Sequence, residues 1–427
     1  MSDTSSHPRS LPRTSTLVFS AFAGIGVLTF ILGLGGNADR TYRVFLHNWL
    51  LWAALAQGAL VLSCAFRLTH AGWQGPIQRI AESFASYIPV ALLLFGGVYL
   101  GRHHLFEWTV HPVHGKEWFL REGVTFGRDT LILLWCTCVS LLYLWVSVRP
   151  TLGRAREEAS GLRRTLYARW TAGWRGEAAE ADLAFRRGRK LAAVVVLSYA
   201  LGYSLLAVDL VMSLSPEWVS TMFPAYFAWG GFLSAISLTT LVYILQRNSP
   251  ETDVGFSRLR SHDLGKMIFA FSIFWMYLFW SQYLVIWYGN VPEETGFIGA
   301  RLGSQFLQDT WYMAGFWGRI AEPYVRLTLA TWILLWVIPF WVLLGARPKK
   351  TTAILGSVAA GSVFGFWIER YILVTPSLVT PEDVLAGAPI HPFGLIEIGI
   401  ALGFIGIFFL CYLGFSRVFP GVLPPRS

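Results

Sequence analysis

The chain has 427 residues, of which 54% are hydrophobic and 14% are charged, whereas about a quarter of the residues of a soluble domain are charged. Its net charge is +9, but the basic residues lie in gaps between apolar runs and form no nucleic-acid-binding motif. The composition therefore excludes a soluble enzyme and a nucleic-acid-binding protein, and it indicates a membrane protein.

Ten apolar runs follow one another along the chain. A helix needs roughly 20 apolar residues to cross a hydrocarbon core about 30 Å thick. The runs that meet or approach this length are 17–34, 49–66, 84–100, 130–148, 191–212, 223–245, 267–288, 327–344, 353–372 and 395–415. We therefore predict an all-α polytopic fold with about ten transmembrane helices, in one integral membrane domain that spans residues 1–427. The first run lacks a convincing signal-peptide cleavage site and is predicted to remain as a helix.

The distribution of basic residues predicts the orientation. Of the 34 Lys and Arg residues, 24 lie in the two tails and in the gaps after the even-numbered helices. An excess of this kind marks the cytoplasmic side, so both termini are predicted to be cytoplasmic. The longest basic gap, residues 149–190, is interpreted as a solvated cytoplasmic loop drawn to anionic lipid. A docking surface for a cytoplasmic partner is the alternative.

Metal and haem ligands are missing from the predicted spans. None of the nine histidines lies deep in an apolar run, and the four cysteines have no zinc or iron-sulfur spacing. We therefore expect no metal, haem or cluster on this chain, and we predict no catalytic residue of its own. Three glycine pairs spaced four residues apart instead predict close packing between helices: they are Gly97 with Gly101, Gly361 with Gly365, and Gly399 with Gly403.

Ionisable groups within a span are costly and are therefore functional candidates. The clearest is Asp209, one turn from the outer end of the fifth helix. His47 begins the second helix, Glu369 ends the ninth and Glu397 begins the tenth, so all four are predicted on the outer side. We interpret them as candidates for a proton path or a headgroup pocket. For Asp209 the alternative is that it only ties the turn that follows it.

The seventh helix adds a polar stripe. Tyr277, Ser281 and Tyr288 lie within about 40° of one another on a helix of 100° per residue, whereas Gln282 points elsewhere. The stripe is a candidate hydrated path, and the alternative is that its hydroxyls only hydrogen-bond across the bundle. The middle and inner parts of the membrane are predicted to hold few titratable groups.

Two long segments carry a resemblance to a known family. Residues 209–223, with the sequence DLVMSLSPEWVSTMF, resemble the F subunit of alternative complex III, a bacterial quinol oxidoreductase. A second block is similar to the same family: it runs from Asp263 through Ser281-Gln282-Tyr283 to Thr295. The short runs 71–73 and 394–399 extend the resemblance over nearly the whole chain.

The resemblance implies an NrfD-like (polysulfide reductase membrane subunit-like) fold. In that fold two four-helix bundles, from helices two to five and six to nine, are flanked by helices one and ten. It also implies a place in the bacterial inner membrane, beside a related C subunit, a periplasmic iron-sulfur subunit, cytochrome c subunits and small membrane subunits. Quinone or quinol is then the expected small molecule, haem c and the clusters belong to the partners, and a cytochrome or a terminal oxidase accepts the electrons.

One departure from the family pattern concerns the ninth helix. Where the resemblance leads us to expect His-Trp-x-Asp, the chain has Phe366-Trp367-Ile368-Glu369. The carboxylate is kept but the imidazole is lost, and a quinol site usually needs both a hydrogen-bond partner and a base. The related C subunit is therefore the expected home of catalysis.

Two other classes of protein remain open. A secondary transporter also has about ten helices and rare intramembrane charges, although transporters commonly show repeated halves and broken helices. A structural anchor for redox subunits is the third reading.

Overall fold

The computed structural model describes residues 13–246, 257–302, 323–379 and 391–419. These residues are helical or irregular, with no strand among them. Ten helices are long and apolar enough to cross a membrane, which confirms the prediction of an all-α chain with about ten candidate spans. The described chain thus has the helices of a multi-pass membrane protein.

Several of the spans are built from more than one helical element. The spanning helices are α1 (Arg13–Gly36), α2 (Ala38–Leu68), α3 (Gly75–Phe84) continued by η1 (Ala85–Tyr87) and α4 (Ile88–Leu100), α6 (Glu122–Glu158), α8 (Glu177–Leu210), α9 (Phe223–Gln246), α10 (Arg258–Gly289), α13 (Pro323–Trp332) continued by the π-helical η5 (Ile333–Val337) and α14 (Ile338–Val342), α16 (Thr352–Leu378) and α18 (Leu395–Val418). Short helices join them: α5 (Arg102–Leu105), η2 (Glu107–Thr109), α7 (Gly161–Trp170), η3 (Met212–Leu214), α11 (Pro292–Leu302) and α15 (Ala346–Lys350).

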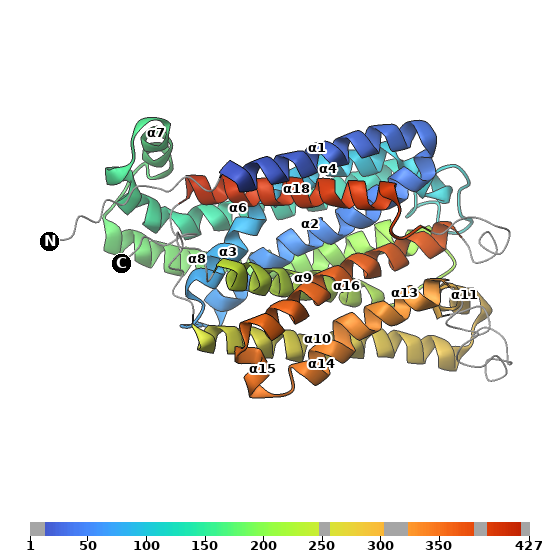
Figure 1. Ribbon diagram of the computed structural model, residues 1–427. Coiled ribbons are helices and arrows are strands. Elements are labelled where there is room, and N and C mark those ends of the chain that lie inside the picture. The colour runs from blue at the N-terminus through green and yellow to red at the C-terminus, as the bar shows by residue number, and fades with distance from the viewer. Residues whose placement is uncertain (1–12, 247–256, 303–322, 380–390, 420–427) are drawn as a thin grey trace.

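The spans run side by side and alternate in direction (Figure 1). We call the end where α1 begins and α18 ends the terminal end, and the opposite end the far end. The connections that contain α7 and α15 lie at the terminal end, and α11 lies at the far end. Asp209, His47, Glu369 and Glu397 all lie in the parts of their helices toward the far end.

Helix α2 is the centre of the packing. Its most apolar stretch is 94% buried, whereas that of α1 is 11% buried. Small residues let neighbouring backbones approach it: a Cβ on Gly58 would lie 2.8 Å from the carbonyl oxygen of Gly231 in α9. Such close approach is how helices associate where lipid offers no hydrophobic drive.

The predicted helix boundaries differ most from those in the structure around residues 149–190. The structure continues α6 to Glu158 and begins α8 at Glu177, so most of this segment is helical. Arg149 of α6 binds Glu180 of α8 through two hydrogen bonds of 2.7 and 3.0 Å, and it also donates to the carbonyl groups of Trp170 and Ala172. Hydropathy detects only the apolar part of such a helix, because charged residues end the apolar run without ending the helix.

Helices α1 and α18 pack along one another through glycines. A Cβ on Gly26 would lie 2.2 Å from the Cα of Gly403, and one on Gly399 would lie 2.4 Å from Oγ1 of Thr29. The Gly399 and Gly403 pair thus marks close helix packing, as predicted. Cβ atoms on Gly97 and Gly365 would likewise meet side chains of neighbouring helices at 2.7 and 2.9 Å.

We expect Gly26→Leu to separate α1 from α18, because the new side chain has no space and overpacking costs about 1–3 kcal/mol. The measurement is crosslinking of Phe19→Cys to Phe409→Cys, whose rings stack at 4.9 Å, with a short bifunctional thiol reagent. Gly24→Leu is the matched control, since a Cβ there meets nothing within 4 Å. Equal crosslinking in the two leucine variants would contradict the close contact.

Candidate functional site

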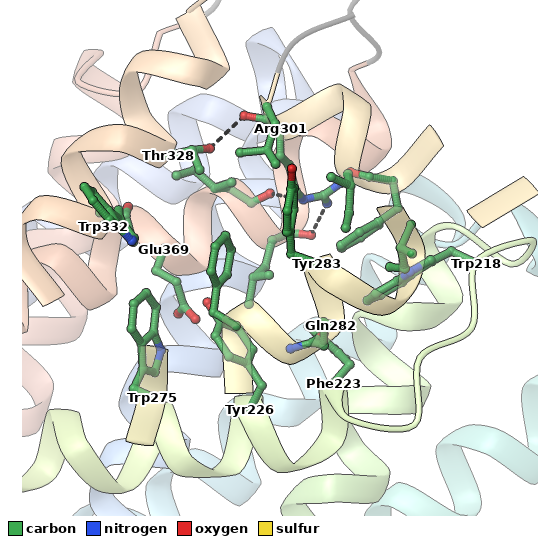
Figure 2. Close-up of a pocket in the computed structure, with 18 residues that line it drawn as sticks. Trp218, Phe223, Tyr226, Trp275, Gln282, Tyr283, Arg301, Thr328, Trp332 and Glu369 are labelled. Carbon is green, nitrogen blue, oxygen red and sulfur yellow. Dashed lines mark hydrogen bonds between the residues drawn. The ribbon is translucent and has the colours of Figure 1, made fainter. Parts of the chain in front are cut away.

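The main cavity lies between α9, α10, α11, α13 and α16 and has a volume of about 80 Å³. Its wall is largely aromatic, and a smaller number of polar side chains interrupts it. The lining residues are Trp218, Phe223, Tyr226, Trp275, Phe279, Gln282, Tyr283, Ile286, Phe297, Ile298, Arg301, Leu302, Thr328, Thr331, Trp332, Glu369, Ile372 and Leu373. Figure 2 shows these side chains converging from the surrounding helices. An apolar cavity with a few convergent polar groups is typical of small-molecule sites.

Glu369 is the acidic group of this cavity. It is 2% exposed, and its Oε2 atom accepts a 2.8 Å bond from Arg370, which is itself 0% exposed. The hydroxyl of Tyr226 lies next to the carboxylate. Even so, Oε1 of Glu369 has no partner of good hydrogen-bond geometry within the described ranges. Figure 2 shows Glu369, Tyr226 and Trp275 facing one another.

Polar groups with spare hydrogen-bonding capacity line the rest of the wall. In the described part of the chain, the Nε1 atoms of Trp275 and Trp218 and Oγ1 of Thr331 have no hydrogen-bond partner. Trp218 stacks on Phe297 with ring centroids 3.5 Å apart, and this contact fixes the Trp218 ring in the cavity wall. The π-helical segment Ile333–Val337 begins two residues after Thr331, and such segments often occur at functional sites. The cavity therefore offers one carboxylate acceptor and several donors around an aromatic space.

Arg301 attaches α11 to α16 at a proline. Pro376 has no N–H, so it cannot donate to the carbonyl group of Ile372 four residues earlier. Arg301 replaces that donor with a 3.1 Å bond to Ile372, and it also binds the carbonyl group of Leu373 at 3.0 Å and Oγ of Ser377 at 2.8 Å. Arg301 belongs to α11, which is not one of the spanning helices. Burial away from water lowers the pKa of Arg301 to about 9.

We expect Arg301→Met to destabilise the protein by about 1–3 kcal/mol, because it leaves buried carbonyl groups without donors. In a Pro376→Ala background the Ile372 carbonyl regains a backbone donor, so the cost should fall by about 1 kcal/mol. Thermal unfolding of the two single variants and the double variant measures this coupling. An identical cost in both backgrounds would show that Arg301 does not compensate for Pro376.

Asp209 lies outside this cavity, in a second polar site. Its carboxylate is 0% exposed and binds Arg128 of α6 through two bonds of 2.9 and 2.7 Å. The Asp209 side chain does not tie the following turn: Ser213 instead donates to the backbone carbonyl group of Asp209. Asp129 of α6 is also 0% exposed and lies next to Asp209. Asp129 was not among the predicted candidates, because the predicted fourth helix began one residue after it.

His47 and Glu397 lie on the other side of α16. The ring of His47 packs at 5.6 Å from the rings of both Trp367 and Tyr371. Its Nε2 atom is 3.0 Å from the amide nitrogen of Asn48, so with that amide orientation Nε2 is the acceptor. Glu397 joins α18 to α2 through two 2.8 Å bonds to Arg40. A small cavity of about 20 Å³ lies between Arg40, Tyr371, Glu397 and neighbouring side chains.

The stripe on α10 is not gathered with the other candidates. Tyr277 and Tyr288 are 56% and 86% exposed, and Ser281 donates to the backbone carbonyl group of Tyr277. Gln282, on a different face, is the buried residue that lines the main cavity. Within the described residues, Ser281 bonds inside its own helix and Asp209 bonds to Arg128, so these side chains are not directly joined.

A further buried polar network lies toward the terminal end, where α2, α3 and α6 meet. Glu82 of α3 is 0% exposed and accepts hydrogen bonds from Ser63, Gln78, Arg79 and Ser147 at 2.6–3.0 Å. Arg67 of α2 donates to the same Ser147 at 2.8 Å. Glu82 was not among the predicted candidates because the third helix was expected to begin at residue 84, whereas the structure begins it at Gly75.

No group of three or more His, Cys, Asp and Glu side chains suited to a metal gathers among the residues that the structure describes. In comparisons with protein-family models and with curated proteins, nothing matches this chain.

Proposed function

We propose that this chain is a membrane subunit of a respiratory quinol oxidoreductase of the alternative complex III type, and that a quinol headgroup enters the cavity beside Glu369. The observation that carries the proposal is a buried carboxylate in a mostly apolar, aromatic-rich cavity, in one of ten candidate spans. The resemblance of residues 209–223 and 263–295 to the F subunit family supports the choice of complex.

The chemistry of a quinol suits this cavity. A quinol is a planar ring with two hydroxyl groups, and aromatic walls bind such rings by offset stacking or edge contacts. Trp275 and Phe279 supply parallel faces, with ring centroids 6.0 Å apart. Oε1 of Glu369, which has no partner of good geometry among the described residues, can accept a hydrogen bond from one quinol hydroxyl, while Trp275 Nε1 and Thr331 Oγ1 can donate to the second oxygen.

Catalysis and electron transfer are assigned to partners in this proposal. Phe366 stands where the family pattern has a histidine, and it is buried in the core with an edge contact to Trp275. In this proposal the chain positions quinol and transfers protons, while the related C subunit oxidises quinol. Periplasmic iron-sulfur and cytochrome c subunits carry the electrons to a cytochrome or a terminal oxidase.

The proposed architecture is the NrfD-like one. The first bundle comprises α2, α3 with α4, α6 and α8, and the second comprises α9, α10, α13 with α14, and α16, with α1 and α18 at the edge. The contacts of α6 with α8, of α10 and α16 with α9, and of α1 with α18 support this division. The main cavity then belongs to the second bundle.

The proposed location is the bacterial inner membrane with the terminal end in the cytoplasm, supported by the excess of basic residues there. A cysteine in place of Ala179, which is exposed on α8, should resist an impermeant thiol reagent in whole cells. A cysteine in place of Gly296, which is exposed on α11, should react. The reverse pattern would overturn the orientation.

A secondary transporter is the second candidate function, and one observation favours it. The π-helical segment Ile333–Val337 interrupts a span beside the cavity, and transporters use interrupted helices at their substrate sites.

Purification of the tagged chain from its native membranes in mild detergent decides between these functions. Under the proposal the preparation contains haem c and iron-sulfur clusters in fixed ratio to the chain, and it transfers electrons from quinol to a cytochrome. A colourless chain that purifies alone and is stabilised by a small solute would instead show a transporter.

A further inference from the structure

The buried acidic residues differ in how their charge is balanced. Six acidic side chains are buried in the described part of the chain: Glu82, Asp129, Glu180, Asp209, Glu369 and Glu397. Five of them form an ion pair with an arginine, namely Glu82 with Arg79, Glu180 with Arg149, Asp209 with Arg128, Glu369 with Arg370, and Glu397 with Arg40. Asp129 is the exception.

Asp129 has no donor for either oxygen. Both of its carboxyl oxygens are buried and lack a hydrogen-bond partner of good geometry within the described residues. The charged groups that face it are Asp209 on α8 and Arg128 on its own helix. Both of the Arg128 donors that point inward, Nε and Nη2, are already bound to Asp209.

One guanidinium can balance only one of these two carboxylates. A second ionised carboxylate would be buried beside a like charge, with no donor among the described residues, which is strongly unfavourable. Buried acids in this position bind a proton instead, as neighbouring carboxyl pairs do. Asp209 is the member that stays ionised, because a two-point bond to arginine is among the strongest that a carboxylate makes.

We propose that Asp129 is a proton-binding site that holds one exchangeable proton at neutral pH, while Asp209 remains the ionised partner of Arg128. The inference does not depend on the assignment to a quinol oxidoreductase. The residue that exchanges the proton is then Asp129 of α6, whereas the sequence had indicated Asp209 of α8.

The position of the pair gives the proton a short route to the surface. Asp209 lies in the last turn of α8 at the far end, and the side chain of its partner Arg128 is 23% exposed. In the exchange step the O–H bond of Asp129 breaks and the proton passes to water beside Arg128. The reverse step restores the neutral acid, so the pair returns to a single negative charge balanced by Arg128.

Infrared spectroscopy of the full-length protein, purified with its partners retained, tests this site. At neutral pH the wild type should show the C=O stretch of one protonated carboxyl group, shifted on transfer to D₂O. Asp129→Asn should remove this band, while Asp182→Asn, a change at an exposed residue of α8, should leave it unchanged. Absence of the band in the wild type, or its persistence in Asp129→Asn, would overturn the proposal.

Isotope labelling provides a test that requires no variant. Aspartate labelled with ¹³C at its side-chain carboxyl group should shift the same band in the wild-type protein, whereas labelled glutamate should not. A band that responds only to labelled glutamate would place the proton on another residue and would also overturn the proposal.

Discussion

Glu369→Gln should destabilise the folded protein by about 3–5 kcal/mol, the usual cost of removing one partner of a buried ion pair. The variant leaves the guanidinium of Arg370 buried without its counter-charge, with only neutral acceptors such as the carbonyl group of Phe227 near it among the described residues. Thermal unfolding in detergent should show a clearly lowered midpoint. Bound quinol should raise this midpoint less than it does in the wild type, because a neutral amide replaces the charged acceptor for its hydroxyl and charged acceptors form the stronger hydrogen bonds.

The double variant Glu369→Leu, Arg370→Met separates charge from packing. Replacing both members of a buried pair by apolar residues is often neutral, so much of the lost stability should return. Glu117→Gln, at an exposed glutamate outside the spans, is the matched control and should unfold like the wild type. If the double variant is no more stable than Glu369→Gln, the unpaired arginine is not the cause of the loss.

Glu82→Gln should have an effect of similar size, about 3–5 kcal/mol. It removes the negative charge on which Arg79 and three neutral donors converge, and Arg67 reaches the same network through Ser147. Helices α2, α3 and α6 meet there, so we expect loosened packing at the terminal end. Hydrogen exchange of the backbone amides of these helices measures the loosening.

Glu157→Gln is the matched control, because Glu157 is exposed near the end of α6. It should leave the hydrogen exchange of these backbone amides unaffected. Protection that falls equally across the far end would indicate global unfolding rather than a local role for Glu82.

The helices could be predicted because an uninterrupted apolar run has one explanation in a chain of this composition. Their ends could not, because α6 and α8 continue as charged helices held by Arg149 and Glu180. For the same reason the third helix was predicted to begin at residue 84 and not at Gly75, so Glu82 lay outside the predicted span. Interactions between residues that are distant in the sequence decide these boundaries, and a hydropathy profile carries no information about such interactions.

The candidate site was predicted only in part. Glu369 could be chosen because an acid in a span is costly, and the structure places it in the main cavity. Asp129 and Arg301 were missed, since each lies beyond the end of a predicted span and its role depends on a partner in another helix. Tyr277 and Tyr288 share a face as predicted, but only the packing of α10 could show that this face is exposed.

The most direct test of the quinol proposal is photolabelling of the native complex with a light-activated quinone analogue, followed by peptide mapping. Under the quinol proposal we expect labelled residues on α10, α13 and α16, around Trp275, Thr331 and Glu369, with labelling blocked by excess quinol. We also expect weaker labelling at these positions in Glu369→Gln. Labelling confined to other parts of the complex, or no greater here than with an apolar probe that lacks the quinone ring, would contradict it.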